Sequence, residues 1–101
     1  MCNVNHSCRI FPENWLEPLS LKDLFDISQP LEIDVGCGKG RFLLRRATNG
    51  PETNFLGIER KLRRVRKIDK KAMKLGIRNL RLLRMDAYYA IHYYLNPSDK
   101  I

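Results

Sequence analysis

Three carboxylates stand at regular places along the chain, and the first lies beside a cluster of glycines. Residues 34–40 read DVGCGKG, in which Asp34 precedes Gly36, Gly38 and Gly40. Glu59 follows the last of these glycines by nineteen residues, and Asp86 lies further along. Glycines permit a sharp turn and a close approach of a ligand to the backbone. An acid about twenty residues beyond such a turn is placed to hydrogen-bond a ribose diol, so the pattern favours a nucleoside cofactor.

The glycine spacing distinguishes between classes of nucleoside cofactor. A dinucleotide-binding turn reads G-x-G-x-x-G and offers a pyrophosphate its bare amides. Here the spacing is G-x-G-x-G, and Asp34 would repel a pyrophosphate but attract a cationic sulfonium and an amino group. S-adenosylmethionine carries both groups and is the expected cofactor. A nicotinamide-dependent Rossmann oxidoreductase is one alternative, and a tight turn that binds no ligand is another.

These residues need a scaffold of alternating strands and helices to bring them together. Apolar runs predict strands over residues 31–35, 54–58 and 79–85. Helical periodicity predicts helices over residues 41–48, 62–75 and from Asp86 to about Tyr94, after a short lead-in helix broken at Pro18. Such alternation indicates a parallel sheet with right-handed crossovers. The three acids should therefore meet at the carboxyl edge of the sheet, where open α/β sheets bind ligands.

The segment from Arg60 to Leu75 concentrates the positive charge of the chain. The whole chain has a formal net charge of +8, and this segment holds nine Lys or Arg residues against one acid, Asp69. Apolar residues recur between them at helical spacing, so one helix face should be basic. Such a face is typical of phosphate binding, with a merely solvated face as the alternative. The candidate RNA-binding residues are Lys61, Arg63, Arg64, Arg66, Lys67, Lys70 and Lys71.

Composition restricts the class of protein. A chain of 101 residues with 44% hydrophobic and 30% charged residues is typical of one soluble globular domain. It contains no apolar run long enough to span a membrane, and its first residues are too polar for a secretion signal. Its three cysteines have neither metal-binding spacing nor a disulfide framework. We therefore expect a cytoplasmic protein without a metal or a membrane partner, in which residues 1–12 form a flexible tail.

Aromatic residues and a cysteine offer weaker candidates. The tyrosines near the end of the sequence could stack on bases, but their spacing on a helix predicts that they divide between packing and surface; they are Tyr88, Tyr89, Tyr93 and Tyr94. His92 lies among them and is not expected to be catalytic. Cys37 lies inside the glycine turn, but no base lies near it in the sequence, so a nucleophilic role is not expected.

Three strings of the sequence resemble one enzyme family. LEIDVGCGKGRFLL, NFLGIE and LGIRNLRLLRMDA together are similar to the bacterial tRNA (guanine-N7-)-methyltransferases, and the similarity runs from about Trp15 to Leu95. The resemblance implies a Rossmann-like class I methyltransferase fold of α/β type, with three αβα layers and parallel central strands. It also implies transfer of a methyl group from S-adenosylmethionine to N7 of guanine in the variable loop of tRNA.

The resemblance further implies roles for single residues. Asp34 would contact the methionine end of the cofactor or its water shell, within a loop formed by Gly36, Gly38 and Gly40. Glu59 would hold the ribose hydroxyls, and Asp86 with Ala87 would meet the adenine. Arg60, which follows the ribose acid, is a further cofactor-binding candidate without a defined role.

One family motif has no match in this sequence. It reads acid-Pro-Trp-x-Lys, shapes the guanine pocket and supplies the acid assigned to the transfer. We therefore expect residues 13–101 to form the N-terminal half of a methyltransferase domain, truncated after the third βα unit and inactive by itself, with catalytic residues beyond Ile101. The family's strand order would leave residues 31–35 at an open edge that favours oligomerisation or strand exchange. A non-catalytic RNA-binding or partner-dependent fragment is the alternative function.

Overall fold

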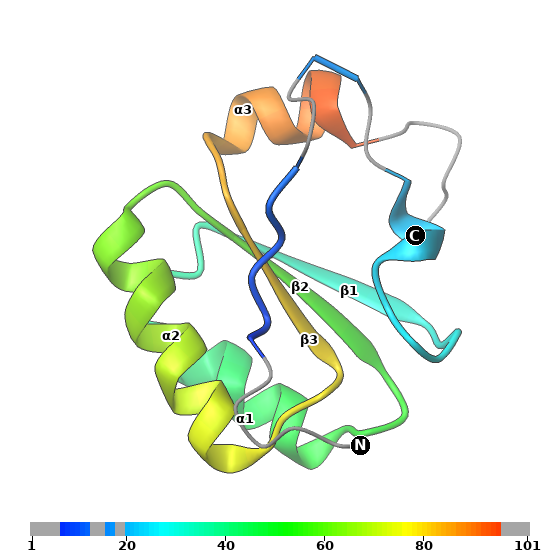
Figure 1. Ribbon diagram of the computed structural model, residues 1–101, viewed down its shortest axis with the longest axis vertical. Helices are drawn as coiled ribbons and strands as arrows, with labels where there is room; N and C mark the ends of the chain where they lie inside the picture. The colour runs from blue at the N-terminus through cyan, green and yellow to red at the C-terminus, as the bar shows by residue number, and fades with distance from the viewer. Residues whose placement is uncertain (1–6, 13–15, 18–19, 96–101) are drawn as a thin grey trace.

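Three parallel strands form the centre of the computed structural model, which describes residues 7–12, 16–17 and 20–95 (Figure 1). The strands are β1 (Leu31–Val35), β2 (Asn54–Glu59) and β3 (Leu80–Arg84), in the order β1-β2-β3. The helices that follow them are α1 (Arg41–Asn49), α2 (Leu62–Leu75) and α3 (Ala87–Tyr89), and α3 continues into the π-helix η2 (Ala90–Tyr94). The predicted order of elements is therefore confirmed.

The segment before β1 differs from its prediction. Instead of a helix broken at Pro18, the described residues there form a single 3-10 helix, η1 (Leu21–Asp23). Residues 13–15 and 18–19 lie outside the described ranges. Leu21 is buried against the sheet, whereas Leu16 is 88% exposed, so the apolar residues of this region do not all face the core.

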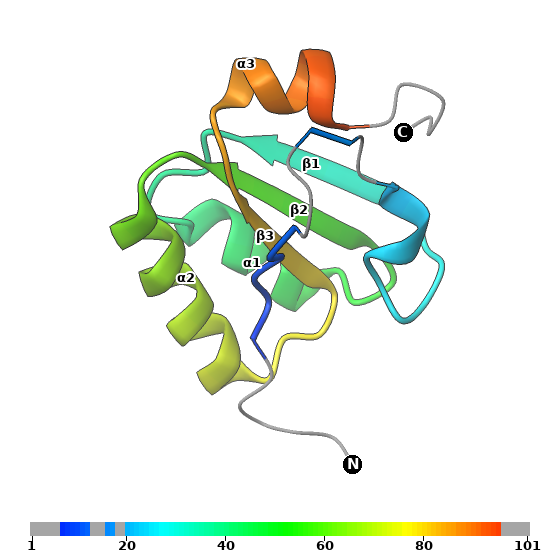
Figure 2. The ribbon, with the colours of Figure 1, turned by 45° about the horizontal axis from the view of Figure 1, so that its top comes forward.

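The helices divide between the two faces of the sheet (Figure 2). Helices α1 and α2 pack on one face, where Leu43 and Ile68 meet Phe55 and Leu82 in one hydrophobic cluster. η1 and η2 pack on the opposite face, where alternate strand residues such as Leu56 point. This is the predicted three-layer α/β arrangement, a partial Rossmann-like fold. It follows from the alternation of side chains along each strand, which requires apolar cover on both faces.

Strand β2 is the buried centre of the molecule, and all six of its residues are buried. It pairs in parallel with β1, where Asp34 is opposite Gly57, and with β3, where Glu59 is opposite Arg84. A Cβ atom on Gly57 would lie 2.5 Å from Leu43 Cδ2, so glycine is needed for the close approach of α1. This packing holds the end of β2, and with it Glu59, in a rigid position.

Strand β1 lies at an edge of the sheet. Among the described residues no strand pairs with its second side, and Val35 is 41% exposed. Unpaired strand edges tend to pair with another strand. Oligomerisation or strand exchange through this edge stays a prediction.

Residues 7–12 correct the prediction of a flexible tail. Arg9 forms a parallel bridge with Leu82, and the Ile10 amide donates a hydrogen bond to the Leu82 carbonyl at 2.8 Å. Cys8 is fully buried, and its amide donates to Oδ1 of Asp69 at 2.7 Å. The segment therefore covers the outer edge of β3. The prediction was wrong for these residues because their partners, Leu82 on β3 and Asp69 on α2, are distant in the sequence. Residues 1–6 lie outside the described ranges.

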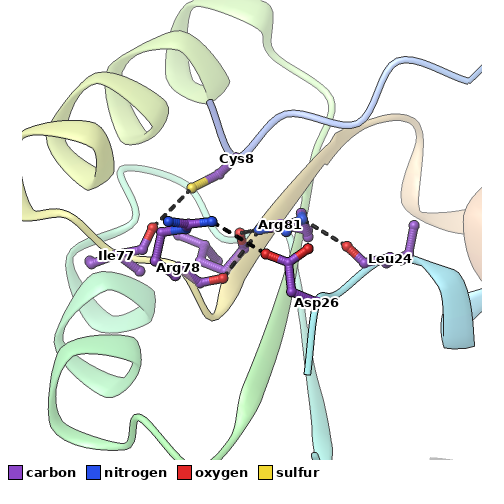
Figure 3. A network of polar contacts seen from close by, with 7 residues as sticks. Cys8, Leu24, Asp26, Ile77, Arg78 and Arg81 are labelled. Atoms are coloured by element: carbon purple, nitrogen blue, oxygen red, sulfur yellow. Dashed lines mark hydrogen bonds and ion pairs between the residues drawn. The ribbon is translucent and has the colours of Figure 1, made fainter. Parts of the chain in front are cut away.

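A buried arginine ties the segment before β1 to the amino end of β3 (Figure 3). Arg81 is 8% exposed, and its Nε donates to the Leu24 carbonyl at 2.8 Å. Its guanidinium lies over the Phe25 ring, 5.2 Å from the ring centroid. Next to it, Arg78 pairs with Asp26 at 3.3 Å. Carbonyl acceptors satisfy the buried cation here, because a buried polar group without partners would destabilise the fold.

Gly40 provides a test of the packing between the glycine turn and α2. Its φ is +77°, and an added Cβ would lie 2.5 Å from Ile68 Cγ1. Gly40→Ala should lower the free energy of unfolding by about 1–2 kcal/mol for left-handed backbone and by roughly 1–3 kcal/mol more for overpacking. Gly76→Ala, at φ +68° with no atom within 4 Å, should show only the first loss. Urea unfolding followed by circular dichroism measures both, and equal losses would contradict the packing argument.

Candidate cofactor site at the carboxyl edge of the sheet

The structure places the three sequence-predicted acids at one edge of the sheet. Asp34 is the penultimate residue of β1, Glu59 ends β2, and Asp86 follows β3 by two residues. Because neighbouring parallel strands end on the same side, these side chains belong to one region. Glu59 is 6% exposed, whereas Asp34 is half-buried and Asp86 is exposed. Glu59 is thus the carboxylate that the fold holds most firmly.

The glycine turn passes from β1 to α1 in left-handed steps. Gly36, Gly38 and Gly40 have φ values of 66°, 58° and 77°. The Gly36 amide donates to the Ile58 carbonyl at 2.8 Å, which fixes the turn against the end of β2. An added Cβ on Gly36 would meet no atom within 4 Å, so the turn is open on that side. A ligand could approach the backbone there without displacing a side chain.

The Glu59 carboxylate fastens the glycine turn to the start of α2. Its Oε1 accepts a hydrogen bond from the Gly38 amide at 2.9 Å, and its Oε2 accepts one from the Lys61 amide at 2.9 Å. A carboxylate offers about four lone-pair positions. These are the hydrogen bonds that Glu59 accepts within the described ranges, which leaves about two positions for hydroxyl groups of a ligand.

The environment keeps Glu59 ionised at neutral pH. Burial raises the pKa of its carboxyl, but the Lys61 and Gly38 amides and the cations of Arg64 and Lys61 outweigh burial and hold the pKa below its ordinary value. Burial also raises the pKa of Asp34. At this edge the ionised form is therefore favoured for Glu59 and less favoured for Asp34.

The thiol of Cys37 is influenced by the negative charges of two of the acids, Asp34 and Glu59. Burial first, and then the negative charges of Asp34 and Glu59, raise the pKa of its thiol to about 12. The thiol is therefore protonated at neutral pH and is a poor nucleophile. The absence of a nucleophilic role for Cys37 stays a prediction.

The residues after β2 and β3 complete this edge. The Arg60 carbonyl accepts a hydrogen bond from Arg84 Nε at 3.2 Å. Asp86 caps α3, since its Oδ2 accepts a hydrogen bond from the Tyr89 amide at 3.1 Å, and the half-buried Ala87 follows it. Contact of Asp86 and Ala87 with an adenine stays a prediction.

Most of the predicted RNA-binding residues lie together on the exposed side of α2. Four of them line, with Leu62, an open hollow of about 420 Å³: Arg63, Arg66, Lys67 and Lys70. Lys61 and Lys71 are exposed as well. Asp69 does not reduce this charge at the surface, because it is buried and its Oδ2 accepts a hydrogen bond from the Ser7 hydroxyl at 2.8 Å. The charged residues on the exposed side of α2 are therefore all basic.

Arg64 is the exception among these cations. It is half-buried, and its Nη1 lies 3.9 Å from the position that a Cβ on Gly38 would take. It therefore faces the glycine turn and contributes to the low pKa of Glu59. No pattern in the sequence indicates this contact, because Glu59 and Arg64 belong to different elements and only the packing of α2 brings them together.

A separate cavity of about 510 Å³ lies at the opposite, amino edge of the sheet. Segment 25–29, the last turns of α1 and α2 and the residues before β3 line it, and no predicted site residue does. Within the described ranges, no cluster of three potential metal ligands occurs. In the part of the chain that the structure describes, no helix is long and apolar enough to cross a membrane.

Comparison with known proteins identifies relatives for most of the chain. A family model described as "Putative methyltransferase" matches residues 28–100. A "tRNA (guanine-N(7)-)-methyltransferase" from Macrococcus caseolyticus is 49% identical over 65 residues, which are 64% of this chain and 31% of that protein. One from Microcystis aeruginosa is 38% identical over 97% of this chain and 46% of its own length, and one from Rubrobacter xylanophilus is 34% identical over 82% of this chain and 37% of its own length. The chain thus spans less than half the length of these curated relatives.

The position of Arg64 predicts a change in the titration of Glu59. In Arg64→Ala the pKa of Glu59 should rise, because a nearby cation that favours the carboxylate is lost. Lys67→Ala, which removes an exposed cation from the same helix, should leave it unchanged. The titration is followed through the Glu59 side-chain carboxyl carbon by NMR.

The same titration should appear in stability. Folding lowers the pKa of the Glu59 carboxyl, so the ionised carboxylate adds to the free energy of unfolding. This addition is complete above the ordinary pKa of 4.5 and is lost as the pH falls through the pKa of the folded state. Identical Glu59 titrations in both variants would show that Arg64 does not act on this carboxylate.

Proposed function

Because the chain belongs to the tRNA (guanine-N(7)-)-methyltransferase family, we propose that it forms the S-adenosylmethionine-binding part of an enzyme that methylates N7 of guanine in the variable loop of tRNA. The observation that carries this proposal is the Glu59 carboxylate. It ends the central strand, is ionised, and holds the glycine turn while two lone-pair positions stay available. A tRNA substrate is consistent with the cytoplasmic location expected from composition.

The residues at the carboxyl edge fit S-adenosylmethionine. Glu59 would accept hydrogen bonds from the two ribose hydroxyls, whose geometry suits a carboxylate. The open side of Gly36 leaves the turn accessible to the ligand. Asp34 would place negative charge near the sulfonium and the amino group. Asp86 and Ala87, at the end of β3, would border the adenine, with Arg60 beside the ribose acid.

The chain's own contribution to catalysis would be positioning. When bound, S-adenosylmethionine supplies an electrophilic methyl group on a positively charged sulfur. Guanine N7 has a free lone pair, so the reaction needs a strong general base less than methylation of an amine would. The Glu59 carboxylate and the glycine turn would fix the ribose, and Asp34 the charged end, so that most of the rate would come from alignment. The acid-Pro-Trp-x-Lys motif has no match here, so we expect this chain by itself to bind the donor without completing the transfer.

The exposed side of α2 would contact the tRNA backbone. Its cations lie along one helix face, and the acid of this helix, Asp69, is directed to the N-terminal segment. Phosphates attract such a face without regard to sequence. Arg64 would serve the cofactor site instead, because it faces Gly38.

Loss of the Glu59 carboxylate should abolish binding of S-adenosylmethionine. Hydrogen bonds to a charged acceptor contribute about 1.5–3 kcal/mol each, so removal of two should weaken affinity by a factor of at least roughly 100. Isothermal titration calorimetry compares wild type with Glu59→Ala. Glu52→Ala, which changes an exposed glutamate before β2, is the control and should bind as wild type. Unchanged affinity of Glu59→Ala would refute the assignment.

Affinity for tRNA should fall steeply with salt, because contact with phosphates releases counterions. Arg66→Ala combined with Lys70→Ala should weaken binding and reduce the slope of log K against log salt by about 2. Arg46→Ala is the matched control, since Arg46 lies on α1 with its charge paired to Glu32. Fluorescence anisotropy with labelled tRNA gives both quantities. A flat salt dependence would mean that the basic face of α2 is only solvated.

A further inference from the structure

A cluster of exposed aromatic rings lies on α3 and η2, beside the candidate cofactor site. The Tyr88 ring centroid lies 4.2 Å from that of His92 and 6.3 Å from that of Tyr93. Tyr88 and Tyr93 are each 62% exposed, and His92 is exposed as well. Single exposed aromatic residues are common, whereas grouped ones indicate a surface that meets a partner.

The π-helix explains how this cluster forms. Tyr88 and Tyr93 are five residues apart, and a regular α-helix would direct them about 140° apart. A π-helical turn closes i to i+5 hydrogen bonds and brings such residues to the same side; the bond from the Leu95 amide to the Ala90 carbonyl, at 2.9 Å, has this spacing.

Tyr89 and Tyr94 are also five residues apart and lie on one side of the helix, but this side faces the sheet. Tyr89 and Tyr94 stack with centroids 6.3 Å apart and planes 22° apart, and Tyr94 is 2% exposed. The wide turn therefore sorts four tyrosines into an inward pair and an outward pair. The inward pair holds the turn on the sheet, which fixes the backbone beneath the outward pair. Such turns occur frequently at functional sites.

Two arginines lie near the start of this element, next to the capping acid Asp86. Arg84 ends β3 and donates to the Arg60 carbonyl, and both arginines are exposed. Arg60 directly precedes Lys61 and the basic side of α2. In Figures 1 and 2 the first turns of α2 and α3 lie at the same end of the sheet. The cations therefore run from α2 through Arg60 and Arg84 to the strand end from which the aromatic cluster starts.

We propose that Tyr88, His92 and Tyr93 form a stacking platform for an unpaired base of the tRNA whose phosphates contact α2. The proposal rests on the proposed function, because it takes tRNA as the partner. Aromatic side chains next to a basic track are the usual means of binding single-stranded nucleic acid, since every base offers a face for stacking. The charge complementarity between the surrounding arginines and phosphate favours this partner over an apolar protein surface.

The test compares variants of the full chain by fluorescence anisotropy with labelled tRNA over a range of salt. Tyr88→Ala combined with Tyr93→Ala should weaken binding roughly tenfold, within the range for loss of base stacking. The slope of log K against log salt should not change, because stacking releases no counterions. Tyr88→Phe combined with Tyr93→Phe keeps the rings and should bind as wild type. Thermal unfolding checks that these exposed substitutions leave the fold intact.

The outcomes distinguish a failure of the stacking proposal from a failure of the proposed function on which it rests. If the alanine pair binds as wild type while Arg66→Ala with Lys70→Ala weakens binding, the platform is refuted and the proposed contact of α2 with tRNA stands. If the phenylalanine pair loses as much affinity as the alanine pair, hydroxyl groups rather than ring faces make the contact, and the stacking proposal is again refuted. If wild type itself does not bind tRNA, both proposals fail for this chain.

Discussion

The hydrogen bonds of the Glu59 carboxylate to the Gly38 and Lys61 amides join two segments that the rest of the candidate site depends on. One segment is the turn after β1, and the other is the start of α2. The carboxylate can join them because it ends β2, whose residues are all buried and whose backbone is therefore well fixed. A turn that is already ordered loses little conformational freedom when a ligand binds, so the site is organised in advance.

Close packing of the helices on the sheet sets the position of this carboxylate. Gly57 lets α1 approach β2, and Gly40 lets the turn approach Ile68 of α2. At both places a methyl group would collide with a core side chain. The glycine at position 40 is therefore required by the packing as well as by the backbone conformation. A substitution of Ile68 or Arg64 on α2 would alter the glycine turn or the charge near Glu59.

Helix α2 performs two tasks on its two sides. Its inward residues belong to the hydrophobic core, and Asp69 on this side holds the N-terminal segment through Ser7 and Cys8. Its outward side keeps only positive charge, which suits a polyanion. The aromatic cluster of α3 and η2 starts from the same end of the sheet, so the charged surface and the aromatic surface adjoin the candidate cofactor site.

The order of the elements, the glycine turn and the three acids at the strand ends could be predicted from the sequence, because hydrophobic periodicity and glycine placement act over a few neighbouring residues. The similar strings also indicated the family. The pairing of residues 7–12 with β3, the direction of Arg64 and the widened turn that sorts the tyrosines could not. Each of these depends on backbone hydrogen bonds or on contacts between distant segments, and such contacts exist only once the sheet and its helices have packed together.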